Sequence, residues 1–96
     1  MKSFKAGGTF YPLNHVVRIS VQHVDDGYEI YLDYGMLNTM PDVRLPVAIK
    51  RVDEYEALVK KIFQWFNYKS SPDVFDVDKV VADVIRNCEQ LRGYYV

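Results

Sequence analysis

The spacing of apolar side chains changes near residue 52, and this change constrains the fold more than any other feature of the chain. Before residue 52, apolar residues recur at every second position, as in segments 17–21, 28–34 and 43–49. After it they recur at every third or fourth position, as in 55–66 and 77–91. A period of two lines one face of a strand, and a period of 3.6 lines one face of a helix. The sequence therefore predicts strands followed by helices, an α+β domain.

We expect the single domain 1–96 to form a three- to four-stranded antiparallel sheet with two C-terminal helices packed on one face. Strands 16–24 and 28–34 form a hairpin, because Asp25-Asp26-Gly27 is a turn signal between them. Another strand covers 43–50. The segment Thr9-Phe10-Tyr11 is an edge or irregular strand, since Pro12 has no N–H to donate to a neighbour.

The first helix is predicted from Asp53 to about Asn67, with Glu56 placed to complete a capping box with Asp53. The second helix begins with Asp76 or Asp78 as its cap and ends before Gly93. The inward sides of the strands, including Val17, Ile19 and Val21, are expected to face these helices.

Composition describes an ordinary globular domain. The 96 residues are 49% hydrophobic and 26% charged, and the formal net charge is −1. This charge argues against a protein whose main role is to grip phosphate backbones. Cys88 is the single cysteine, so no internal disulfide can form, and its place in an apolar helix stripe is that of a small hydrophobic residue. No apolar run approaches the ~18 residues of a membrane span, so we expect a cytoplasmic protein that does not enter membranes.

Residues that could carry chemistry form no catalytic or metal-binding motif. His15 and His23 lack further histidine or cysteine partners at ligand spacing, so we expect no zinc site. Gly7-Gly8 is not followed by the G-K-S/T of a phosphate loop, and no serine stands in a G-x-S-x-G context. We therefore predict neither an enzyme nor a bound cofactor.

The densest acidic group contains Asp73, Asp76, Asp78 and Asp83. Acidic side chains near a helix N-terminus cap free amides and favour the helix dipole, and this is the interpretation we prefer. Cation binding by Asp73, Asp76 and Asp78 stays open as the alternative, although the spacing is not that of an EF-hand loop.

A partner-binding surface is the remaining functional hypothesis. If one side of the sheet faces the helices, the opposite side carries a mixed polar set: Arg18, Ser20, Gln22, Glu29, Tyr31, Asp33, Arg44 and Lys50. Trp65 lies at the margin of its helix stripe, where it either closes the core or anchors an interface. Further contact candidates are the flexible apolar residues of loop 35–42 and two tyrosines after Gly93: Met36, Leu37, Met40, Tyr94 and Tyr95.

The arrangement of short strands, an acid-capped helix ending in Trp65-Phe66 and a second amphipathic helix resembles small phage-encoded inhibitors of type I CRISPR systems. Segment 53–58 and Gln64-Trp65-Phe66 carry most of this resemblance. Segment 9–17 also resembles short uncharacterised bacterial and prophage proteins. The resemblance implies a non-enzymatic inhibitor that blocks a host protein complex by surface complementarity.

Two functions from different classes follow. The first is a protein-binding module, in which Arg18, Glu29, Tyr31, Asp33 and Arg44 are contact candidates. Homodimerisation through an edge strand or through residues 36–40 is a further possibility. The second is a single-stranded nucleic-acid module in which the polar sheet face stacks bases and contacts phosphates.

Overall fold

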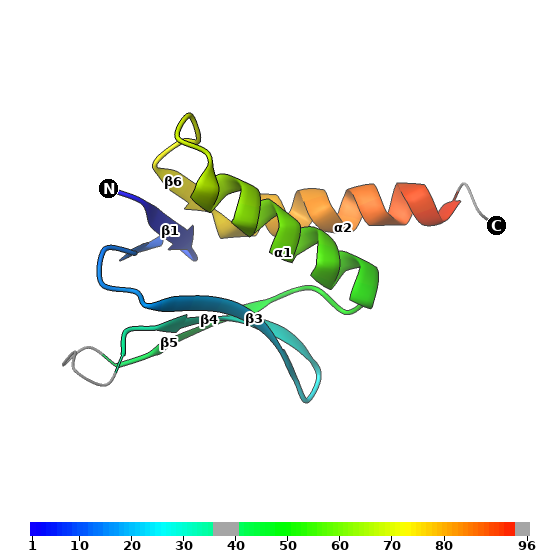
Figure 1. Cartoon of the computed structure of the whole chain (residues 1–96). Helices are drawn as coiled ribbons and strands as arrows, with labels where there is room; N and C mark the ends of the chain where they lie inside the picture. Colours follow the sequence, from blue (N-terminus) through cyan, green and yellow to red (C-terminus); the bar gives the residue numbers. More distant parts are fainter. Residues whose placement is uncertain (36–40, 94–96) are drawn as a thin grey trace.

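The computed structural model of the chain describes residues 1–35 and 41–93, and it shows an α+β fold in which the helices lie together above the longer strands (Figure 1). The elements in chain order are β1 (Ser3–Ala6), β2 (Thr9–Pro12), β3 (Arg18–Val24), β4 (Gly27–Asp33), β5 (Val43–Val47), α1 (Val52–Asn67), β6 (Val74–Asp76) and α2 (Val77–Gly93). The predicted fold class, with an antiparallel sheet and two C-terminal helices, is confirmed.

The strands form two separate sheets. The antiparallel sheet has the order β3-β4-β5, with the predicted hairpin joining β3 to β4. The second sheet has the order β2-β1-β6, in which β1 pairs antiparallel with β2 and parallel with β6. Strands β1 and β6 and this second sheet were not predicted, because β6 contains only three residues and pairs with a strand near the start of the chain.

Central strand β4 supplies the middle of the core. Ile30 and Leu32 have no exposed surface, and they belong to one cluster with Leu58 and Ile62 of α1. Full burial of a side chain of this size contributes about 1.5–3 kcal/mol. The alternation of strand residues therefore determines which sheet face receives the helices, as predicted.

An aromatic cluster joins the second sheet to the C-terminal half of α1. The ring centroids of Phe4, Trp65 and Phe75 lie 5.2–5.5 Å apart. Trp65 donates its indole N–H to the carbonyl oxygen of Pro72 at 2.6 Å, and the Lys2 ammonium lies 4.6 Å from the Trp65 ring centroid. Residues from three distant parts of the chain thus hold this end of the molecule together.

The start of α1 differs from the expected capping box. Arg51 is the N-cap residue and makes no side-chain cap bond, while Glu56 is exposed. The buried Glu54 carboxylate instead accepts the Lys50 N–H at 3.1 Å and a guanidinium N–H of Arg92 at 3.2 Å. Arg92 also donates to both carboxylate oxygens of Asp53, at 2.9 and 3.0 Å, so both acids in the first turn of α1 pair with α2.

The second helix buries Val77, Val81, Val84 and Cys88. Asp76 accepts the Lys79 N–H at 3.2 Å, so it caps α2 as one of the two predicted candidates. Within residues 1–35 and 41–93, no helix has the length and apolarity required to cross a bilayer.

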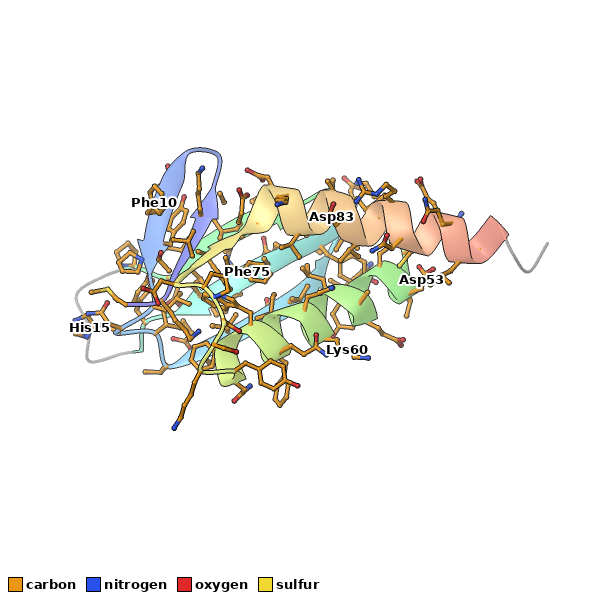
Figure 2. The ribbon with its side chains drawn as sticks, turned by 90° about the horizontal axis from the view of Figure 1, so that it is seen from above. Phe10, His15, Asp53, Lys60, Phe75 and Asp83 are labelled. Atoms are coloured by element: carbon orange, nitrogen blue, oxygen red, sulfur yellow. The ribbon has the colours of Figure 1, made fainter. Side chains whose placement is uncertain are left out.

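We expect Phe4→Ala to lower the free energy of unfolding by about 3–5 kcal/mol, because it removes a fully buried ring from the aromatic cluster. Phe10→Ala is the matched control, since Phe10 is 57% exposed on the outer side of the β1–β2 hairpin (Figure 2). Its expected effect is within about 0.5 kcal/mol. Urea denaturation followed by circular dichroism measures both, and equal unfolding midpoints would contradict the assignment.

Candidate functional site

An apolar groove of about 450 Å³ runs between β3 and α1. It is lined by segment 16–21, which includes the first half of β3, and by one side of α1. We call it the β3–α1 groove, and its main apolar residues are Val17, Ile19, Val21, Tyr55, Val59, Ile62, Phe63 and Phe66. Arg18, Ser20 and Asn67 add polar groups to the lining.

The groove exists because the apolar stripe of α1 is wider than the surface that covers it. Leu58, Ile62 and Trp65 are buried. In the neighbouring row, Phe63 is 67% exposed and Phe66 is 47% exposed. The apolar period over 55–66 predicted that both rows lie on the helix face that packs on the sheet, and for the outer row this is wrong. The width of the stripe was the sequence signal that could have identified the groove.

Val17 requires a second correction. We expected its side chain to face the helices with Ile19 and Val21, but it is 69% exposed. Strand β3 begins only at Arg18, and the Val17 N–H bonds to the Asp33 carbonyl oxygen at 2.8 Å just before the regular ladder. Val17 therefore lines the groove with an exposed isopropyl group, whereas Ile19 and Val21 pack partly against the core.

The opposite face of the β3-β4-β5 sheet carries the predicted polar set. Strand register places Arg18 opposite Asp33, and it aligns Ser20, Tyr31 and Arg44 in one row across the sheet. The next row contains Gln22, Glu29 and Pro46. Lys50 lies beyond β5 and donates its ammonium to the Asp26 carbonyl oxygen at 2.8 Å.

Side chains on this polar face bind one another. The Arg44 guanidinium lies 4.6 Å from the centroid of the Tyr31 ring and donates to the largely buried Glu29 carboxylate. Arg18 lies 3.4 Å from the Asp33 carboxylate. The Tyr31 hydroxyl donates to Asp42, whose other oxygen accepts the Tyr34 N–H at 3.2 Å. The arginines and the tyrosine are therefore partly engaged within the fold.

The Tyr31–Asp42 hydrogen bond changes the ionisation of both groups. It is the main reason that the pKa of the Tyr31 phenol is raised, with lost hydration and the Asp42 charge adding to it. The same bond, with that from the Tyr34 N–H, lowers the pKa of the Asp42 carboxyl. The bond therefore stabilises the fold between the ordinary pKa values of the two groups, and this contribution is lost as pH falls through the Asp42 pKa or rises through the Tyr31 pKa.

Trp65 lies in the core rather than at the surface. Its side chain is 7% exposed and packs between Phe4 and Phe75, so the structure favours the core alternative over the interface anchor. The other apolar contact candidates, Met36, Leu37, Met40, Tyr94 and Tyr95, lie outside the described residues.

The acidic residues proposed as caps or cation ligands have separate partners. Asp78 accepts the Gly7 N–H at 3.0 Å, and Asp73 lies 3.8 Å from the N-terminal ammonium. Among residues 1–35 and 41–93, no group of three or more His, Cys, Asp or Glu side chains is placed to hold a metal ion. Burial raises the pKa of the Cys88 thiol, which favours its protonated form.

We expect Asp42→Asn to lower the pKa of Tyr31 towards its ordinary value, because the change removes the carboxylate that stabilises the protonated phenol. Asp83→Asn is the control, since Asp83 pairs with Arg86 on α2. A pH titration by NMR of ¹³C-labelled tyrosine rings measures the shift, with Tyr31→Phe identifying the resonance. An unchanged Tyr31 midpoint in Asp42→Asn would show that the bond does not form in solution.

The chain matches no protein-family model, no curated protein and no solved structure.

Proposed function

We propose that this chain is a non-enzymatic protein-binding module and that the β3–α1 groove is its contact surface. The observation that carries this proposal is the continuity of exposed apolar side chains across two layers. Val17 extends from the strand layer, and Val59, Phe63 and Phe66 extend from the helix layer into the same groove. Contiguous exposed apolar surface with a polar rim is typical of interaction sites, since leaving it in water is unfavourable.

The shape of the site favours a polypeptide over a small ligand. The groove follows β3, which pairs with β4 on one side and is one of the two outer strands of its sheet. An outer strand offers backbone N–H and C=O groups to an incoming strand, and the flanking helix offers apolar contacts for alternate side chains of that strand. Backbone pairing and apolar burial can therefore act together.

Inhibition of a larger host complex, which the resemblance to phage inhibitors of type I CRISPR systems implies, is the more specific form of this proposal. A small module that covers a partner's surface needs no catalytic group. The polar face is a second possible contact, through Arg18, Tyr31 and Arg44.

A single-stranded nucleic-acid module is less well supported. Its arginines would have to contact phosphates, but Arg18 faces Asp33 and Arg44 binds Glu29. The Tyr31 ring, which would stack on a base, already contacts the Arg44 guanidinium. Binding of single-stranded oligonucleotides that weakens steeply with salt would favour this alternative, and fluorescence anisotropy at low salt measures it.

We expect Phe63→Asp to abolish association with the protein partner while leaving the fold intact, because Phe63 is exposed in the groove and outside the core. The measurement is retention by the tagged chain of proteins from its source cells, or of an untagged copy of itself. Circular dichroism checks folding. Binding through apolar contacts should change little between low and moderate salt.

Three further variants identify the surface that binds. Phe10→Asp introduces the same charge at a comparably exposed phenylalanine outside the groove, so it should retain the partner. Tyr31→Ala alters the polar face, whereas Arg18→Glu alters a residue that belongs to both the polar face and the groove lining. If Tyr31→Ala releases the partner and Phe63→Asp does not, the polar face carries the function and the groove does not.

A further inference from the structure

The edges of the two sheets differ in how they are protected against pairing with another strand. Strand β2 ends in Pro12, β5 contains Pro46, and β6 has only three residues before it continues into α2. Proline and short length are the usual means of blocking edge pairing. In contrast, β3 has seven residues and contains neither proline nor lysine. Among the described strands, β3 is therefore the edge best suited to accept another strand.

The exposed surface beside β3 requires a partner with two layers. A single added strand would cover the edge of β3, but it would leave much of the helix row formed by Val59, Phe63 and Phe66 in water. A partner that brings a strand and a helix in the same relative arrangement would cover both layers. A second copy of this chain has that arrangement, since its own α1 lies beside its own β3 (Figure 1).

Charge favours an antiparallel meeting of two copies. Strand β3 begins at Arg18, whose side chain is 65% exposed beside Asp33, and it ends at the Asp25-Asp26 turn. Antiparallel pairing of β3 with itself places the Arg18 end of each copy near the acidic turn of the other. Parallel pairing would instead place the two acidic turns together, which is unfavourable.

The charged residues of α1 also favour an antiparallel arrangement of the two copies. In α1 the exposed Glu56 lies in the first half, and Lys60 and Lys61 lie in the second half. Figure 2 shows Lys60 on the side of α1 opposite α2. Two α1 helices related by a two-fold axis run antiparallel, so acidic residues of one helix lie towards basic residues of the other.

We propose that the β3–α1 groove is covered by a second copy of this chain, through antiparallel pairing of the two β3 strands and contact between the two α1 helices. This inference rests on the proposed function, because it names the protein that the groove binds. The resulting dimer has two-fold symmetry and one continuous six-stranded sheet.

The hairpin turn determines which residues meet. Only Asp25 and Asp26 separate the paired residues Val24 and Gly27, and a two-residue turn of this kind closes with a hydrogen-bonded pair. Every second residue counted back from Val24 therefore directs its backbone groups at β4. Ile19, Val21 and His23 direct theirs at the open edge. A two-fold axis at Val21 pairs all seven residues of β3.

The first test is the mass of the purified chain by sedimentation equilibrium. We expect about twice the 11.2 kDa of one chain at concentrations up to about 100 μM, a range that detects micromolar dissociation constants. Phe63→Asp should raise the dimer dissociation constant by at least about 30-fold, as for an interface hot spot. Phe10→Asp should leave it unchanged.

The second test locates the symmetry axis. In the proposed register the two Val21 Cα atoms lie about 5.5 Å apart, within the range that a disulfide spans. Val21→Cys should therefore give a covalent dimer under mild oxidation. Val47→Cys, at a partly buried valine of the other outer strand β5, should not.

The results separate this inference from the proposed function. The chain could be monomeric at every concentration while its groove still binds another protein in a Phe63-dependent manner. This result would overturn the inference that a second copy covers the groove, and it would leave the proposed function standing. A dimer that persists in Phe63→Asp, with no Val21→Cys cross-link, would also overturn the inference. If the chain is monomeric and Phe63→Asp affects no association, both fail.

Discussion

Packing of α1 against the β3-β4-β5 sheet is the interaction on which the rest of the structure depends. Adjacent strands lie about 4.8 Å apart and packed helices about 8–10 Å apart. The axes of two packed helices are therefore about as far apart as the outer strands of a three-stranded sheet, and side chains on the outer sides of the helices extend beyond it. Because α1 turns Leu58 and Ile62 into the core that they share with Ile30 and Leu32 of β4, the row containing Phe63 is turned away from that core and stays exposed. The groove is a geometric consequence of covering three strands with this pair of helices.

Local patterns in the sequence were enough to predict the hairpin, both helices and the polar side of the sheet. These features depend on a period of two or 3.6 and on turn residues close together in the chain. The second sheet was not predictable in the same way, because β6 is too short to show a period and its partner β1 lies about seventy residues earlier. The Glu54–Arg92 pair, which replaces the expected capping box, also joins residues distant in sequence.

The candidate site was less predictable than the fold for a related reason. Apolar periodicity reports that Val59, Phe63 and Phe66 share a side of the helix with the core residues, but it does not report how far the sheet extends beneath them. Trp65 shows the converse, because the second sheet covers a residue that the sequence left at the margin of its stripe. In both cases, the exposure of a residue on α1 depends on where the neighbouring sheet ends relative to the helix.

The polar face of the β3-β4-β5 sheet and the β3–α1 groove differ in charge, and therefore in the kind of contact that each can make. On the polar face, Arg44 binds Glu29 and Arg18 faces Asp33, so a partner must compete with contacts already present. The groove presents apolar groups that lose only water when they are covered. A formal net charge of −1 also means that two copies approach with little long-range repulsion. Self-association through the groove therefore leaves the Arg44–Glu29 pair in place, whereas binding through the polar face competes with it.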